Sequence, residues 1–417
     1  MAMTPGSALR ADFPYFSADP GAVYLDSGAT AQRPARVIDA SAEFARKDYA
    51  AVHRGSSMAT GEATWAFEEA REAVARFVGA GEREIVWTSN ATDALNVIAL
   101  GMADSSAGLG DDRFALRAGD EIVVTEAEHH ANLIPWQRLA AKTGAILRWA
   151  PVDQRGLWTL DGLRQVVSAR TRVIAFAHVS NVTGFVAPVA DIVEIARSVG
   201  AVTVLDACQS VPHMSVKFGE LGVDFAAFSS HKALGPTGIG ALYGRAELLD
   251  MLPPARTGGS MITTVTMEKA EFLPAPQRFE AGTQPVTEAI GFGAAISYLD
   301  ELGMGAVAAH ETEMAHALVD VVERTPGVSL VGPAAGEHRA ALVSFMVQGV
   351  HAHDVGQFLD DKGITVRTGH HCAQPLHRAL GTPSTTRASA SVYTTLDDVA
   401  ALESALGDVR AFFGVDR

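Results

Sequence analysis

The sequence predicts an α/β fold in which a large domain with a mostly parallel sheet is followed by a smaller α/β domain. Short runs rich in β-branched residues alternate with helical patterns from about residue 21 to residue 245. Such alternation is typical of parallel strands whose connecting helices cover both faces of the sheet. A length of 417 residues, of which 48% are hydrophobic, is enough for two or three domains, each with an apolar core.

The strands of the large domain are expected in apolar runs, which in chain order read GAVYLDS, EIVWTS, DEIVVTEAEH, AILRWAPV, TRVIAFAHVS, AVTVLDACQS, DFAAFSS and IGALYG. Helices are expected between these runs, at 91–101, 131–143 and 188–199. Pro188 and Gly200 mark the start and the end of the last of them. The segment 102–119 is rich in Gly, Asp and Ser, which predicts a surface insertion.

Two long helical patterns, one ending near residue 303 and one at 306–325, lead into the second domain. That domain reads αββαβα, with strands at VSLVG, ALVSFMVQ, ITVRTG and TRASASVY. We therefore expect a large domain at 21–295, a small domain at 296–417, and an N-terminal segment, 1–20, that packs with the small domain.

The composition argues against several classes of partner. A formal net charge of -15 and the lack of a Lys/Arg block disfavour nucleic acid. No run approaches the length of a membrane span, and residues 1–20 lack the apolar stretch of a signal peptide, so we expect a soluble, cytoplasmic protein. The cysteines, Cys208 and Cys372, are too few and too far apart for a disulfide framework.

Polar residues at strand ends are candidate site residues, because ligands of open α/β sheets bind outside the carboxyl ends of the strands. Asp206 ends the apolar run VTVLD and is followed by Gln209. Burying an acid there has a cost that a cationic partner, such as a protonated pyridine nitrogen, would offset. A helix N-cap or a structural salt bridge would explain the same acid.

Lys232 follows the apolar run DFAAFSS and His231, and it precedes a Gly-Pro turn. Desolvation at such a place lowers the pKa of an amine, as a Schiff-base lysine requires. A solvated surface charge is the alternative. The glycines of GPTGIG match neither the P-loop nor the dinucleotide fingerprint, so they predict a tight turn rather than a nucleotide site.

Histidines occur in two clusters that could suggest a metal. His129 and His130 in TEAEHHANLIPW are neighbours on a loop and point apart, and no third ligand lies at zinc spacing. HAHD at 351–354 is typical of the N-cap of a helix. We therefore expect no metal.

The order and spacing of Asp206, Gln209, Ser229, His231 and Lys232 resemble the class V aminotransferase family of fold-type I pyridoxal-phosphate (PLP) enzymes. Within that family, the chain is similar to a group II (SufS-type) cysteine desulfurase over nearly its whole length, through AVHRG, EHHANLIPW, HVSNVTG, SSHKALGPTGIG, RFEAGT, VRTGHHCAQPL and TRASASVY. VRTGHHCAQP is the most discriminating of these matches, because it contains the sulfur-accepting cysteine.

The resemblance implies that PLP is bound covalently to Lys232, which also moves the Cα proton of the substrate. Asp206 would hold the pyridinium nitrogen, and Gln209 would hold the phenolic oxygen with Asn181 beside it. His129 would stack on the ring and assist proton transfer near the substrate thiol. The phosphate would be bound by Thr92, Ser229, His231 and, from the second subunit of a homodimer, Thr283.

For the substrate, L-cysteine, the resemblance implies that Arg387 clamps the carboxylate, a role that suits the bidentate geometry of guanidinium. Arg367 would be a further cation of the active site. Cys372 would take the sulfur as a persulfide, release alanine, and pass the sulfur to an acceptor protein.

The residues around the two cysteines agree with different roles for them. RTGHHCAQP is a polar loop in which Arg367, His370 and His371 can lower the pKa of the Cys372 thiol. Cys208 lies in the strand-end run VTVLDACQS and is expected to be an inert, buried residue.

Some features depart from the group II pattern: Ser57 in VHRGSSMAT, Thr394 in YTT, the sequence FEAGTQPV, and the 102–119 insertion. They leave the cofactor residues intact. They leave open which acceptor protein takes the sulfur and whether the pathway is iron–sulfur cluster assembly. A selenocysteine lyase, an aminotransferase or an epimerase would share the fold, and Cys372 separates these from a desulfurase. A non-catalytic assembly scaffold is a further alternative, against which the presence of the lysine, the aspartate and the cysteine argues.

Overall fold

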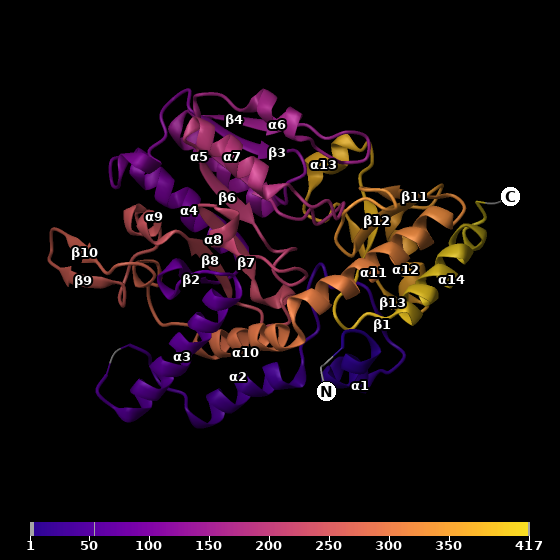
Figure 1. The fold of residues 1–417 in the computed structure, drawn as a ribbon, viewed down its shortest axis with the longest axis horizontal. Coiled ribbons are helices and arrows are strands. Elements are labelled where there is room, and N and C mark those ends of the chain that lie inside the picture. Colours follow the sequence, from indigo (N-terminus) through magenta and orange to yellow (C-terminus); the bar gives the residue numbers. More distant parts are fainter. Residues whose placement is uncertain (1–3, 54, 416–417) are drawn as a thin grey trace.

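Seven strands form the largest sheet of the computed structural model, which describes residues 4–53 and 55–415 (Figure 1). Their order is β2-β8-β7-β6-β5-β3-β4, and β8 lies antiparallel to both of its neighbours while the other pairs are parallel. The mostly parallel sheet predicted from the sequence is therefore confirmed. The strands are β2 (Ile85–Thr88), β3 (Glu121–Thr125), β4 (Ile146–Ala150), β5 (Thr171–Ala177), β6 (Val202–Asp206), β7 (Phe225–Ser229) and β8 (Gly240–Gly244).

Helices cover both faces of this sheet, which explains why its central strands read as continuous apolar runs. In β7, Phe225 and Ala227 enter one apolar core, whereas Ala226 and Phe228 enter the other. The first core is closed by α4 (Ala91–Ser106), α5 (Ile134–Thr143) and α9 (Ala246–Met251). The second is closed by α2 (Ala35–Lys47), α3 (Met58–Phe77), α7 (Val189–Val199), α8 (Phe218–Leu221) and α10 (Val286–Leu302).

A second sheet of four antiparallel strands forms the smaller unit, at the right of Figure 1. In the spatial order β11-β12-β15-β14, its strands are β11 (Val328–Val331), β12 (Leu342–Val347), β15 (Thr385–Ser389) and β14 (Arg367–Gly369). Three helices pack on it around one apolar core: α11 (Met304–Arg324), α12 (Ala352–Asp360) and α14 (Leu396–Phe412). The ring of His351 accepts the His353 N–H at 3.3 Å, so the predicted N-cap at 351–354 is confirmed.

The first apolar run is not part of the large sheet. Residues Val23–Tyr24 form β1, which pairs in parallel with β13 (Ile364–Thr365). Leu25 enters the core of the smaller unit, and Asp26 bridges to Ser389. The sequence run GAVYLDS looks like any other buried strand, so periodicity alone could not show which sheet it joins.

The segment 102–119 is not a mere surface insertion either. Helix α4 continues to Ser106, and Phe114 is buried against Phe225 with ring centroids 6.0 Å apart. Leu116 is buried as well, so exposure is confined to 107–113 and parts of 117–119. The Gly, Asp and Ser content masked the apolar anchors on either side of this loop.

The N-terminal segment contacts the end of the chain. Arg10 pairs with Asp398 at 2.9 Å, and the Phe13 ring lies 4.8 Å from that of Tyr393. We keep the division into 1–20, 21–295 and 296–417 as a proposal. Residues 1–3 of that segment and Arg54 of the AVHRG motif lie outside the described residues.

The remaining elements are short. A hairpin of two strands, β9 and β10, projects from the large unit at the left of Figure 1. Within 4–53 and 55–415, no helix has the length and apolar character needed to cross a bilayer. The bounds are β9 (Ile262–Val265), β10 (Ala270–Phe272), α1 (Pro14–Ala18), α6 (Leu160–Val166), α13 (Gln374–Ala379), and the 3-10 helices η1 (Ser7–Asp12), η2 (Glu82–Glu84), η3 (Asp112–Phe114), η4 (His130–Asn132), η5 (Ser230–Lys232) and η6 (Gln277–Phe279).

Candidate active site

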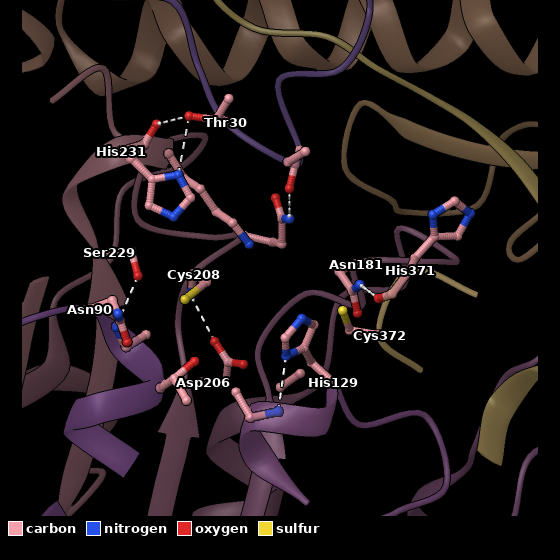
Figure 2. Close-up of a pocket in the computed structure, with 18 of the residues that line it drawn as sticks. Thr30, Asn90, His129, Asn181, Asp206, Cys208, Ser229, His231, His371 and Cys372 are labelled. Atoms are coloured by element: carbon pink, nitrogen blue, oxygen red, sulfur yellow. Dashed lines mark hydrogen bonds between the residues drawn. The ribbon is translucent and has the colours of Figure 1, made fainter. Parts of the chain in front are cut away.

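A cavity of about 510 Å³ opens at the carboxyl ends of β5, β6 and β7 and extends to the smaller unit (Figure 2). Thr283 is exposed and lies outside it. All other predicted site residues line it, namely Thr92, His129, Asn181, Asp206, Gln209, Ser229, His231, Lys232, Arg367, Cys372 and Arg387. Residues nearly 300 positions apart in the sequence are thus gathered at one place by the topology of the two sheets.

Asp206 is the last residue of β6 and is 7% exposed. Its carboxylate accepts the backbone N–H of Cys208 at 3.0 Å, so the acid caps the turn that follows the strand. Gln209 follows in this turn, and its side chain donates to the Gly28 carbonyl oxygen at 2.7 Å. This capping role leaves Asp206 on the cavity wall, where a buried carboxylate favours a cationic partner.

Lys232 ends η5, directly after β7, and is the lysine that lines the cavity. Burial and the Lys232 charge lower the pKa of His129 to about 4, so its ring is neutral near pH 7. Its Nδ1 accepts the Ala131 N–H at 3.0 Å, which places the ring proton on Nε2. His231, beside the lysine, also has its pKa lowered to about 4, first by burial and then by the same charge.

The N-terminus of α4 forms one end of the cavity. Ser229 Oγ accepts the Ala91 N–H at 2.9 Å, and Asn90 caps the helix by accepting the Asp93 N–H at 2.9 Å. Thr92 lies in the first turn of α4. N–H groups and hydroxyls at the start of a long helix suit an anion such as phosphate.

Arg387, on β15, forms the opposite end and is 3% exposed. Its Nη1 donates to the Asn181 carbonyl oxygen at 2.9 Å, and its Nη2 donates to Asp26 at 3.3 Å. Burial lowers the pKa of Arg387 to about 10, which still leaves the guanidinium charged at pH 7. Arg367 also approaches Asp26, at 3.8 Å.

Sequence reasoning missed Asp26. Burial raises its pKa, although Arg387 and Arg367 oppose this shift. A signal was available, because Asp26 ends an apolar run, GAVYLDS, just as Asp206 ends VTVLD.

Glu128 was also missed, and nothing in TEAEHH distinguishes it from Glu126. Its buried carboxyl accepts from Thr125 at 2.6 Å, from Asn132 at 2.7 Å and from the Ala177 N–H at 3.2 Å. Burial, with a smaller contribution from Asp206, raises the pKa of Glu128 to about 8. It fixes the ends of β3 and β5 beside the cavity.

The two cysteines differ as the sequence predicts. Cys372 is exposed and lines the cavity, and Figure 2 shows its sulfur on the side of the turn that faces His129. Cys208 is buried, and burial followed by the charge of Asp206 raises its thiol pKa well above the ordinary value. A neutral, buried thiol is a poor nucleophile.

One expectation about the Cys372 loop is wrong. His371 is buried, and its Nε2 bonds Thr385 at 2.9 Å. Burial and the Arg387 charge lower the pKa of His371 to about 2, so this ring carries no positive charge that could activate the thiol.

Two of the departures from the group II pattern, Ser57 and Thr394, lie outside the cavity lining. Ser57 caps α3 by accepting the Thr60 N–H at 3.2 Å. Thr394 is buried and accepts the Ser391 N–H at 2.9 Å. Ser57 is thus a helix cap, and Thr394 closes a local turn in this chain.

Comparison with known proteins gives the family. The family model described as Aminotransferase class-V matches residues 23–402. The chain belongs to the class V aminotransferase family. The predicted fold type and the PLP cofactor are confirmed with it.

The relatives carry a more specific name. The chain is 52% identical over 415 residues to a probable cysteine desulfurase 2 of Mycobacterium leprae, covering 98% of this chain and 97% of that protein. It is 42% identical over 411 residues to a cysteine desulfurase of Klebsiella pneumoniae, covering 97% and 98%. The structure resembles an apo cysteine desulfurase of Thermococcus onnurineus, with a TM-score of 0.92, 37% identity and coverage of 98% and 99%. Assignment to group II stays a prediction.

The donor set of the cavity fits PLP. A lysine, a buried carboxylate and a helix N-terminus lie around one space, where a phosphate-bearing pyridine aldehyde would find an amine, a partner for its ring nitrogen and an anion site. No group of three or more His, Cys, Asp or Glu side chains suited to a metal occurs in the described part of the chain.

Proposed function

We propose that this chain is a cysteine desulfurase in which Lys232 carries PLP and Cys372 takes the sulfur of L-cysteine. The observation that carries the proposal is that an exposed thiol lines the same cavity as the lysine and the buried aspartate. An aminotransferase or an epimerase has no use for such a thiol.

Each residue has a task that follows from its place. PLP, when bound, acts as the electron sink that makes the Cα–H and Cβ–S bonds of the substrate labile. Arg387 binds the carboxylate, the Lys232 amine removes and returns the Cα proton, and Asp206 stabilises a protonated ring nitrogen. The neutral ring of His129 lies beside the reacting atoms, with a proton on Nε2 that it can give or share.

Sulfur transfer is a displacement at the substrate sulfur. The Cys372 thiolate forms an S–S bond to that sulfur while the Cβ–S bond breaks, and the carbon fragment takes up a proton and leaves as alanine. The enzyme keeps a persulfide on Cys372, which a reductant or an acceptor thiol then removes.

The test is incubation of the PLP-loaded enzyme with L-cysteine under a thiol reductant, with alanine and sulfide measured. Cys372→Ser should bind PLP and L-cysteine and release alanine at no useful rate. Peptide mass analysis after one turnover without reductant should find one added sulfur on the peptide that holds Cys372. Sulfur on Cys208, or near-normal alanine release by the variant, would show that the assignment is wrong.

We also propose an oligomeric state, a protein partner and a cellular location. We propose a homodimer in which Thr283 reaches the phosphate of the partner, a sulfur-acceptor protein that receives the persulfide sulfur, and a cytoplasmic location. Thr283 is exposed and lies outside its own cavity, which supports a role at a second subunit. We expect the sulfur to be used in iron–sulfur cluster assembly.

A further inference from the structure

The turn that carries Cys372 has an unfavourable backbone. His371 has φ of 49° and Cys372 has φ of 56°, so two successive residues with side chains occupy the left-handed region. Residues other than glycine rarely adopt this conformation, and they keep it only where their surroundings hold them. The exposed thiol is therefore at a place that the loop alone would not maintain.

Groups of the large unit donate hydrogen bonds to the carbonyl oxygens of this turn. The side chain of Asn181 donates to the His371 carbonyl oxygen at 2.7 Å. The backbone N–H of His130 donates to the Cys372 carbonyl oxygen at 2.6 Å. Both carbonyls of the left-handed pair are thus held from across the cavity.

The ring of His130 makes a third contact with the loop. Helix α13 begins at Gln374 and has no side-chain cap from its own N-cap residue, Ala373. Instead, Nε2 of His130 accepts the Gln374 N–H at 3.1 Å. A histidine that lies 244 positions earlier in the chain therefore caps the helix that follows the cysteine.

The His130 ring is in the state that this contact needs. Partial burial, the nearby His370 ring and the Arg378 charge lower its pKa, which favours a neutral ring with a free acceptor nitrogen. The His370 ring lies 5.6 Å away, and its Nδ1 accepts the Cys372 N–H at 3.2 Å. The backbone groups on both sides of the thiol are thereby fixed.

We propose that His130 is a positioning residue for sulfur transfer, whose ring and backbone N–H together hold the left-handed turn so that the Cys372 sulfur faces the cavity. The inference rests on the proposed role of Cys372. His129 is the N-cap of η4 and directly precedes His130, so the start of this one short helix positions both the His129 ring beside the cofactor space and the thiol that approaches it. A small displacement of the attacking sulfur lowers the rate of the chemical step much more than it weakens substrate binding.

The test compares His130→Ala with His130→Gln in the PLP-loaded enzyme, because both keep the backbone N–H and only glutamine offers an acceptor near Nε2. For His130→Ala, we expect kcat for alanine release to fall about tenfold, the effect of one lost hydrogen bond in the transition state, with KM for L-cysteine nearly unchanged. His130→Gln should recover most of the rate. The control is His351→Ala, which removes another histidine ring that caps a helix, α12, away from the cavity, and it should leave kcat unchanged.

A second measurement does not depend on turnover. The rate of Cys372 alkylation by iodoacetamide, scored by peptide mass, should change at least threefold in His130→Ala and return toward the wild-type rate in His130→Gln. If Cys372→Ser turned over normally, the proposed role of Cys372 as sulfur acceptor would be wrong. The alkylation rates would still report on whether His130 holds the turn. Unchanged kcat and unchanged alkylation in His130→Ala, or no recovery with glutamine, would overturn the proposal.

Gln374→Pro tests the same hydrogen bond from its donor side. It deletes the donated N–H at the first position of α13, where proline is tolerated, and leaves His130 in place. We expect the same loss of kcat, and a double variant no slower than His130→Ala. Additive losses would mean that the two residues do not act through their mutual bond.

Discussion

Replacing Arg387 by alanine is a direct test of the carboxylate clamp. The guanidinium is 3% exposed and already holds a carboxylate oxygen of Asp26 at 3.3 Å. Truncating one partner of a buried, charge-assisted contact typically costs about 2–5 kcal/mol. If the substrate carboxylate binds there, KM for L-cysteine should rise by a factor of about 30 to about 5000.

The assay is steady-state alanine release over a range of L-cysteine concentrations, with reductant present and bound PLP followed by its visible absorption. Arg387→Lys is the matched control, because it keeps the charge but lacks the planar fork, and it should give an intermediate KM. Arg387→Ala should also lower the melting temperature, since Asp26 is left buried with Arg367 at 3.8 Å. An unchanged KM in a variant that retains PLP would refute the clamp at this residue.

Three further outcomes are expected. Lys232→Ala should lack the visible absorption of covalently bound PLP and release no alanine, because no other lysine in the described part of the chain lines the cavity; a variant that stays coloured and borohydride-reducible would contradict this. Thr283→Ala should weaken PLP binding while light scattering still shows a dimer. A wild-type protein that is a monomer with full PLP occupancy at low concentration would exclude the shared site. His129, His178 and His231 all have pKa values lowered to about 4, mainly by burial, so they take up protons in the unfolded chain before they do in the folded one. The contribution of these rings to stability should therefore be full above about pH 6.5 and be lost as the pH falls toward 4. The difference in melting temperature between the wild type and His178→Gln should change between pH 7 and pH 5, and a constant difference would count against a buried neutral ring at His178.

Much of the large sheet follows from local pattern alone. Strands such as Val202–Asp206 are buried along their whole length, so the residues before the terminal acid are apolar except Thr203, whose hydroxyl is paired with Asp224. The same rule led to Asp206 and Lys232, because both occur where an apolar run stops. Periodicity could not place β1, since its two residues would satisfy either sheet and only the long-range pairing with Ile364 decides.

The charge state around the thiol could not be read from the sequence. His370 and His371 are neighbours and look equivalent in RTGHHCAQP, but the left-handed turn sends the His371 ring into the protein. Burial removes its proton, and only the three-dimensional structure shows this. The ion pairs of Asp26 could not be read from the sequence for a related reason, because its partners, Arg367 and Arg387, lie more than 340 positions further along the chain.

The pairing of β1 with β13 sets an order of events during synthesis. Residues Val23 to Asp26 leave the ribosome among the first, while their partners Ile364, Arg387 and Ser389 are among the last to be made. The large sheet can form in the meantime, since all seven of its strands lie between Ile85 and Gly244. A chain that stopped before residue 364 would therefore leave the Leu25 backbone without its partners Thr365 and Ser389 and Asp26 without its arginines, and its unfinished cavity would have neither a substrate clamp nor a thiol.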